Sequence, residues 1–305
     1  KRFLHEGWLI SWSFIQHLSS LFVRTRADVG FLGLDKERIK TTHGYYSPYG
    51  DALRDLERDS GLDFLCFDIT LKKPVFSYYP CINLSFGYHF ARLCSKIFGL
   101  LRRKKTRINL KSCKSWCKER KLPSDVLDDL FISKTYYLIY FLCRNFQRVI
   151  SKHRLKICFV STWYSNYGMA LSWAAKEQSI PCYDLQHGIA GASSSRAYSL
   201  WSKVPKNGYE LIPNGFWCWN KEDARAVDQW GSTQIPPIRT IVGGCVWQRL
   251  WLEKKQPREI FSVSGFVEKL IKDSKTNILF TMQGNNPPEI LFNLIEHSPS
   301  EWTWW

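Results

Sequence analysis

Short apolar runs alternate along this chain with longer segments of helical periodicity, and the alternation predicts an α/β fold. The runs are four to six residues long and hold many β-branched, aromatic and leucine side chains, a composition typical of buried strands. They lie at residues 29–34, 64–67, 157–160, 180–185, 216–219 and 241–244. Strands joined in this way by helices form a largely parallel sheet.

Helices are predicted between the apolar runs. Asp51 is well placed as the N-cap of the first, because apolar residues at helical spacing follow it. Residues 83–150 are expected to form at least two helices separated by a basic stretch, with Ser124 as the cap of the second. Glu222 and Asp223 would stand in the first turn of a later helix, where acidic side chains favour the helix dipole.

The clearest unit is a strand, a helix and a strand at residues 157–160, 168–177 and 180–185. A crossover of this length is the βαβ pattern, which places the two strands side by side and parallel. Ligands of open parallel sheets bind outside the carboxyl ends of the strands. Residues 162–166 and 186–188, which follow the two strands, are therefore expected to face one cleft.

A similar pattern starts again at residue 277, with an apolar run, a polar loop containing glycine, and a helix from Glu289. Roughly thirty residues are too few for a complete Rossmann-like domain. We therefore expect a Rossmann-like domain with a parallel sheet at 1–245, a connector at 246–274, and only the beginning of a second Rossmann-like domain at 275–305. The sequence would then be a fragment of a longer chain.

Composition narrows the class of protein. The chain has 305 residues, 45% of them hydrophobic, which is enough for a sizeable core. Its ten cysteines include several inside apolar runs, which fits a reducing cytoplasm. Cys113 and Cys117 are the only close pair and have no partner pair at zinc-ligand spacing, so no structural metal is expected. Neither a membrane span nor a secretion signal is evident.

The formal net charge of +16 is unevenly distributed. Residues 101–121 contain ten basic residues and one acidic residue. A solvated surface, an anionic membrane leaflet, a nucleic acid or an acidic substrate would each be compatible with such a segment. Nucleic acid is not expected, because the basic residues are concentrated away from residues 186–188 and no RNA- or DNA-binding signature is present.

The candidate site residues begin at the end of the 180–185 run, with Asp184, Gln186, His187 and Gly188. His187 could serve as a general base or phosphate contact, or could cap a neighbouring carbonyl. Asp184 lies on the same strand face as Gln186. It could orient the histidine, act as a nucleophile in a retaining reaction, or be a buried structural acid.

Further candidates lie at other strand ends. Asp51 is a second candidate base beside its interpretation as an N-cap. Trp163 and Tyr164 could stack on a sugar or a nucleobase, or could pack in the core. Gln283 and Gly284 lie in a loop whose backbone amides could meet a donor phosphate at the following helix N-terminus.

Several of these segments together carry a family resemblance. The sequence 183–188, read as YDLQHG, with Trp163-Tyr164 and residues 203–219, resembles bacterial two-domain GT-B glycosyltransferases of surface polysaccharide (capsule or lipopolysaccharide) biosynthesis. The similarity is densest over residues 156–220 and weaker over 44–56. It implies two Rossmann-like domains, an acceptor-side N-terminal half, and a nucleotide-sugar donor held mainly by the C-terminal half. No cofactor and no obligatory metal are implied.

Related enzymes use UDP-, GDP-, CMP- or CDP-linked sugars, and the resemblance does not choose among them or between hexosyl and Kdo/sialyl transfer. The acceptor would be a glycan or a lipid-linked sugar at the cytoplasmic membrane face, with residues 101–121 on anionic lipid. Two departures stand out: Asp184 occupies a position where Glu is equally expected, and residues 191–196 lack a second histidine before Tyr198, a candidate substrate contact. A nucleotide-sugar epimerase and a non-catalytic basic binding protein remain alternatives.

Overall fold

The computed structural model describes most of the chain, with gaps. The described residues are 26–33, 38–69, 77–102, 111–120, 128–188, 209–257, 259, 276–278 and 289–304. Contacts divide the chain into two units, residues 1–255 and residues 256–305.

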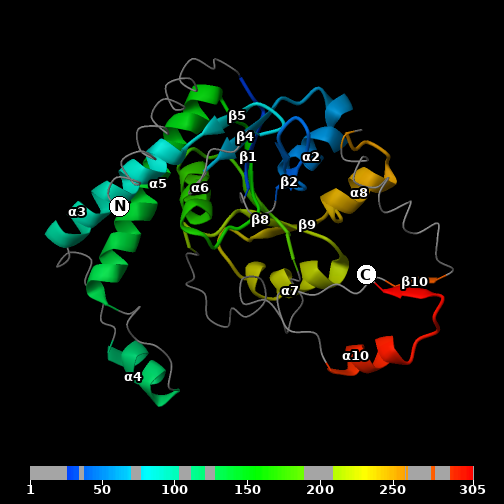
Figure 1. Ribbon diagram of the computed structural model, residues 1–305. Helices are drawn as coiled ribbons and strands as arrows, with labels where there is room; N and C mark the ends of the chain where they lie inside the picture. Colours follow the sequence, from blue (N-terminus) through cyan, green and yellow to red (C-terminus); the bar gives the residue numbers. More distant parts are fainter. Residues whose placement is uncertain are drawn as a thin grey trace, which may run out of the picture. The chain divides into compact units, whose positions relative to one another are not determined.

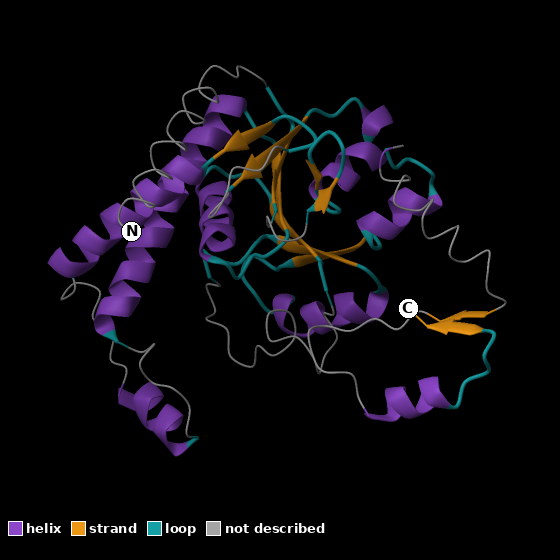
Figure 2. Cartoon of the chain, viewed as in Figure 1, coloured by secondary structure: helices purple, strands orange, loops and turns teal. Residues whose placement is uncertain are grey.

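The first unit is built on a parallel sheet of seven strands (Figures 1 and 2). The strands are β1 Val29–Leu32, β4 Phe64–Asp68, β5 Cys81–Asn83, β6 Ile157–Val160, β7 Cys182–Leu185, β8 Gly215–Cys218 and β9 Arg239–Val242. Their order across the sheet is β5-β4-β1-β6-β7-β8-β9. The parallel α/β fold expected from the sequence is therefore confirmed, and it is consistent with a Rossmann-like architecture.

This strand order locates the site edge of the sheet. The chain starts at β1, winds outward through β4 and β5, and then returns to the other side of β1 to continue through β6, β7, β8 and β9. The direction of winding reverses between β1 and β6. In doubly wound sheets, the crevice outside the carboxyl ends of the strands at such a reversal is where ligands bind. Functional side chains are therefore expected at the ends of β1, β6 and β7.

The predicted βαβ unit is confirmed. Strands β6 and β7 are parallel neighbours, with Cys158 opposite Cys182 and Phe159 opposite Tyr183. Helix α6, Asn166–Glu177, connects them, and Ser165 caps it by accepting a hydrogen bond from the Gly168 amide at 3.0 Å. Strand β5 was not predicted from the sequence, and β9 begins two residues earlier than expected.

The other helices of the first unit follow the expected pattern in part. They are α2 Gly50–Leu56, α3 Ser85–Leu101, α4 Lys111–Glu119, α5 Asp129–His153, α7 Lys221–Gly231 and α8 Val246–Leu252. Glu222 and Asp223 do lie in the first turn of α7. The expected cap Ser124 lies outside the described residues, and α5 instead has Asp128 as its N-cap, accepting hydrogen bonds from two backbone amides. The basic stretch between the long helices contains a helix of its own, α4.

Successive side chains of each strand point to opposite faces of the sheet, and helices cover both faces. Cys158, Val160 and Phe216 belong to a core cluster that also includes Phe146 of α5 and Leu171 of α6. Helices α3 and α5 pack along each other, and α5 packs against α6. Helices α2 and α8 contact each other on the other side of the sheet (Figure 1).

Part of the connector expected at 246–274 belongs to the first unit. Residues 246–252 form helix α8, and the Lys255 ammonium donates a hydrogen bond to the Leu56 carbonyl at 2.7 Å. In the second unit, β10 Thr276–Ile278 pairs in parallel with β11 Trp302–Trp304, and helix α10 Glu289–Glu296 lies between them in sequence. Among the described residues, none of the helices has the length and apolar character needed to cross a membrane.

Candidate functional site

Side chains from three loops meet at the carboxyl edge of the sheet. Tyr164 follows β6, His187 follows β7, and Tyr49 is the N-cap of α2 in the connection that follows β1. The Tyr164 hydroxyl lies 3.1 Å from His187 Nε2, and the Tyr49 hydroxyl donates to the His187 carbonyl at 3.1 Å. Residues 162–166 and 186–188 were expected to face one cleft, and the structure brings them together at this pair. Tyr49 was not among the residues predicted from sequence.

His187 is suited to accept a proton. Burial lowers the pKa of its imidazole below the ordinary value of 6.5, and a backbone hydrogen bond at Leu185 opposes the shift. The ring is therefore mainly neutral at neutral pH, and a neutral imidazole has one basic nitrogen. Tyr164 is 48% exposed, so solvent reaches the neighbourhood of Nε2. A substrate hydroxyl could reach the same nitrogen.

Two buried hydroxyls mark the point where the winding of the sheet reverses. Ser161 is completely buried and Thr162 is 5% exposed. The Ser161 amide donates to the Leu32 carbonyl of β1, which places it beside the end of that strand. Neither side-chain hydroxyl has a hydrogen-bond partner among the residues that the structure describes. A buried hydroxyl without a partner costs about 1–3 kcal/mol, so this pair favours a ligand or a water molecule as its partner.

Asp184 is a structural acid in this geometry. Its side chain is completely buried in β7, and Oδ1 accepts a hydrogen bond from the Trp163 amide at 3.0 Å. The contact ties the loop after β6 to the neighbouring strand, which holds Tyr164 in position next to His187. Trp163 is 4% exposed and lies 6.3 Å from the Phe216 ring, so it packs in the core.

Gln186 shapes the turn that carries His187. Its amide nitrogen donates to the Gly188 carbonyl and to Asp223 Oδ2, both at 2.8 Å. Its amide oxygen accepts from the Trp219 backbone amide at 2.7 Å. Because the side chain is 3% exposed and uses both ends internally, it positions its neighbours. The carboxyl ends of β7 and β8 are joined through it.

Asp51 differs from its sequence interpretation as an N-cap. Helix α2 begins at Gly50, and Tyr49 is the N-cap residue. Asp51 lies in the first turn, where Oδ2 accepts the Ser47 amide at 2.7 Å and Oδ1 accepts the Cys66 thiol at 3.5 Å. Burial raises the pKa of this carboxyl to about 6. The N-cap expectation was wrong because the Ser47 hydroxyl, three residues before Gly50, already accepts the Gly50 amide.

A second buried polar cluster lies beside Asp51. Arg38 Nη1 forms a 3.2 Å ion pair with Asp68 at the end of β4 and donates to the Ser77 hydroxyl at 2.7 Å. Both charged side chains of the pair are at most 6% exposed. A cavity of about 10 Å³, near the size of one water molecule, is lined by Arg38, Asp51 and Cys66 among others. Sequence reasoning missed this cluster, although Asp68 directly follows an apolar run.

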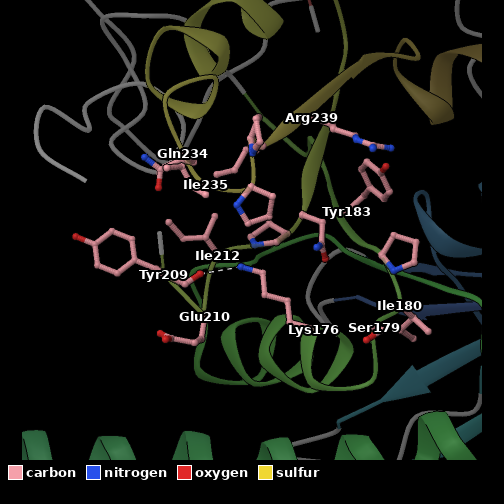
Figure 3. Close-up of a pocket in the computed structure, with 16 residues that line it drawn as sticks. Lys176, Ser179, Ile180, Tyr183, Tyr209, Glu210, Ile212, Gln234, Ile235 and Arg239 are labelled. Carbon is pink, nitrogen blue, oxygen red and sulfur yellow. Dashed lines mark hydrogen bonds between the residues drawn. The ribbon is translucent and has the colours of Figure 1, made fainter. Parts of the chain in front are cut away.

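A much larger cavity, of about 650 Å³, lies at the opposite edge of the sheet. It is lined by residues that precede β7, β8 and β9, with Lys176, Tyr209 and Arg239 around it (Figure 3). The Lys176 ammonium donates to the Tyr209 carbonyl at 2.7 Å, and burial lowers its pKa. Size alone would favour this cavity. The carboxyl edge is the better candidate site because it carries His187 in contact with Tyr164, next to the reversal of the strand order.

No model of a known protein family matches this chain, and no curated protein matches it significantly.

The remaining predicted contacts, Tyr198, Gln283 and Gly284, lie outside the described residues. Gly188 is described, and a Cβ at that position would meet no atom of the described residues within 4 Å. Across the part of the chain that the structure describes, no group of three His, Cys, Asp or Glu side chains is arranged to hold a metal ion.

Proposed function

We propose that this protein is a glycosyltransferase that moves a sugar from a nucleotide-sugar donor to a glycan or lipid-linked acceptor. The observation that carries the proposal is the neutral His187 imidazole at the carboxyl edge of a doubly wound parallel sheet, in contact with Tyr164. The sequence resemblance of residues 183–188 to GT-B glycosyltransferases supports the same assignment. The acceptor would occupy the edge formed by the ends of β6 and β7.

The chemistry assigned to His187 is general base catalysis. As the acceptor oxygen forms its bond to the anomeric carbon, its proton passes to His187 Nε2 and the bond from that carbon to the donor phosphate breaks. Tyr164 holds the imidazole ring by the 3.1 Å contact at Nε2, so an acceptor hydroxyl would take the place of the tyrosine hydroxyl or share the nitrogen with it. Asp51 contacts Ser47 and Cys66 instead, which favours His187 over Asp51 as the base.

The donor is tested by ligand-induced stabilisation. We expect one of UDP, GDP, CMP and CDP, or a sugar conjugate of one, to raise the melting temperature, since a ligand that binds only the folded state stabilises it. His187→Ala should keep that shift and lose about 100-fold or more in turnover. His297→Ala, an exposed histidine of the second unit, is the matched control and should retain both.

The pH profile gives a second test. Because burial lowers the pKa of His187, the active neutral form should persist below pH 6.5, and turnover should fall only as the pH drops through that lowered value. A rate that rises on acidification would contradict a base at His187. A protein that no nucleotide or nucleotide sugar stabilises would remove the transferase assignment itself.

A further inference from the structure

Helix α3 has its small residues on the inside. The buried members of this helix are Ser85, Ala91, Ser95 and Gly99. They allow close packing on α5: the Ser133 hydroxyl donates to the Gly99 carbonyl at 3.1 Å, and a Cβ on Gly99 would lie 3.1 Å from backbone atoms of Lys134. The completely inward positions of α3 are thus small, while Tyr88 and Phe98 are partly buried at the contact, Phe98 with its ring 5.3 Å from that of Phe141 in α5.

Five large apolar residues of α3 are on the outside. Their exposed fractions are 54% for Phe90, 54% for Leu93, 49% for Ile97, 60% for Leu100 and 77% for Leu101. At about 100° per residue these five fall within an arc of about 100°, opposite the small residues. We call them the apolar stripe. A helix that folds onto its domain normally turns such residues inward, so the stripe is available for a partner.

The surroundings of the apolar stripe are cationic. Helix α3 contains no acidic residue. Its basic residues Arg92 and Lys96 and its C-cap Arg102 are exposed, and Lys96 borders the stripe around the helix axis. The chain then continues into the segment 101–121, with its ten basic residues and one acidic residue. An exposed apolar helix face with basic flanks is the pattern of helices that lie in the interface of an anionic membrane.

An apolar groove begins where the stripe begins. Its volume is about 380 Å³, and Phe90 belongs both to the stripe and to the groove wall. Phe86, Leu142 and Phe146 are among the other apolar residues of the wall. The charged residues that line the groove are all basic side chains, Arg148 and Lys152, with His153 nearby in the wall. The groove thus extends the same combination of apolar surface and positive charge.

Other occupants fit these features less well. The phosphates of a nucleic acid would pair with the basic side chains but would leave the apolar stripe exposed to water. A second copy would cover the stripe but would bring two strongly basic 101–121 segments together. A bilayer containing anionic lipid provides an apolar layer and a negative surface at the depths where a helix of this kind needs them.

We propose that α3 is a membrane-docking helix, whose apolar stripe inserts into the interface of an anionic bilayer while the flanking basic residues contact the headgroups. This assigns the principal contact to α3, whereas the sequence alone indicated only the basic residues 101–121. The inference does not depend on the glycosyltransferase proposal, because docking requires neither a donor nor a catalytic base.

The test uses the whole chain and vesicles without any nucleotide. Ile97→Gln/Leu101→Gln removes two exposed apolar side chains of the stripe, and Leu62→Gln/Leu252→Gln removes two others of matched exposure, 46% and 81%, elsewhere. Cosedimentation is measured with phosphatidylcholine vesicles alone and with vesicles containing 30% phosphatidylglycerol. We expect the unaltered protein and the control to bind the anionic vesicles equally, and the stripe variant to bind about tenfold more weakly or worse.

Three results would overturn the proposal. The first is an unaltered protein that does not bind anionic vesicles. The second is a stripe variant that binds as well as the control, with binding that high salt abolishes, which would assign the contact to the basic residues alone. The third is a dimer in sedimentation velocity that the stripe substitutions convert to a monomer without any vesicle binding, which would assign the stripe to a second copy. Because the substituted residues are exposed, melting temperatures of all variants should agree.

Discussion

Replacing Asp51 with Asn tests how strongly the folded protein opposes ionisation of this carboxyl. Asp51 is 5% exposed, and burial raises its pKa from an ordinary value of 3.8 to about 6. Asn is nearly isosteric and keeps an oxygen that can accept the Ser47 amide. The substitution therefore removes the titratable group while preserving the hydrogen bond that joins it to the loop before α2.

The expected magnitude follows from the difference in pKa between the folded and unfolded states. A pKa raised by about two pH units corresponds to roughly 3 kcal/mol. The folded state favours the protonated carboxyl, so the stability linked to Asp51 is complete below pH 3.8 and is lost as the pH rises through about 6. About 2 kcal/mol of this loss falls between pH 4.5 and pH 7.5.

The assay is urea unfolding, followed by tryptophan fluorescence at those two pH values. The free energy of unfolding of Asp51→Asn, relative to the unaltered protein, should rise by about 2 kcal/mol between pH 4.5 and pH 7.5. Asp59→Asn, which removes an exposed carboxylate from the next turn of the chain, controls for the loss of charge. If the Asp51 and Asp59 variants show the same pH dependence, burial does not perturb Asp51 and our account of this site is wrong.

Three further substitutions and one control probe the packing of the first unit, each by the same urea titration. Gly168→Ala should lower the free energy of unfolding by about 3 kcal/mol, because a Cβ there would lie 2.2 Å from a backbone carbonyl of the loop after β6. Gly188→Ala is the control: a Cβ there would meet no described atom within 4 Å, so the free energy of unfolding should change by less than about 0.5 kcal/mol. Phe146→Ala should cost about 3–5 kcal/mol, since this ring is 1% exposed in the core; a cost below about 1 kcal/mol would show that the core is not packed as described. Gln186→Leu should cost about 3 kcal/mol by leaving a buried amide and a buried carboxylate without their partner, and an unchanged midpoint would contradict that role.

The βαβ unit around α6 was predictable because its signals are local. Apolar runs of strand length, a serine before the helix and helical spacing between the runs each act within a few residues. The parallel pairing of β6 and β7 then follows from the length of the crossover. This is why the approach of Tyr164 to His187 could be anticipated. Strand β5, with three residues at the edge of the sheet, has no comparable local signal.

The rest of the site depends on contacts between distant parts of the chain. Tyr49 reaches the carbonyl of His187 across 138 positions of sequence, and nothing near Tyr49 indicates that partner. From the sequence, Gln186 was predicted to contact the substrate, because it is polar and directly precedes His187. Its roles emerge only when Trp219 and Asp223 are brought against it by β8 and α7.

The sequence by itself determined most of the strands and helices, that the strands are parallel, and that polar residues collect at their carboxyl ends, because hydrophobic periodicity and capping act over short distances. Only the tertiary structure decided the strand order, which locates the reversal between β1 and β6. It alone showed which face of α3 is buried, since periodicity reveals that a helix has two unlike faces and the neighbouring helix selects between them. In α3 the small residues of the helix lie against α5.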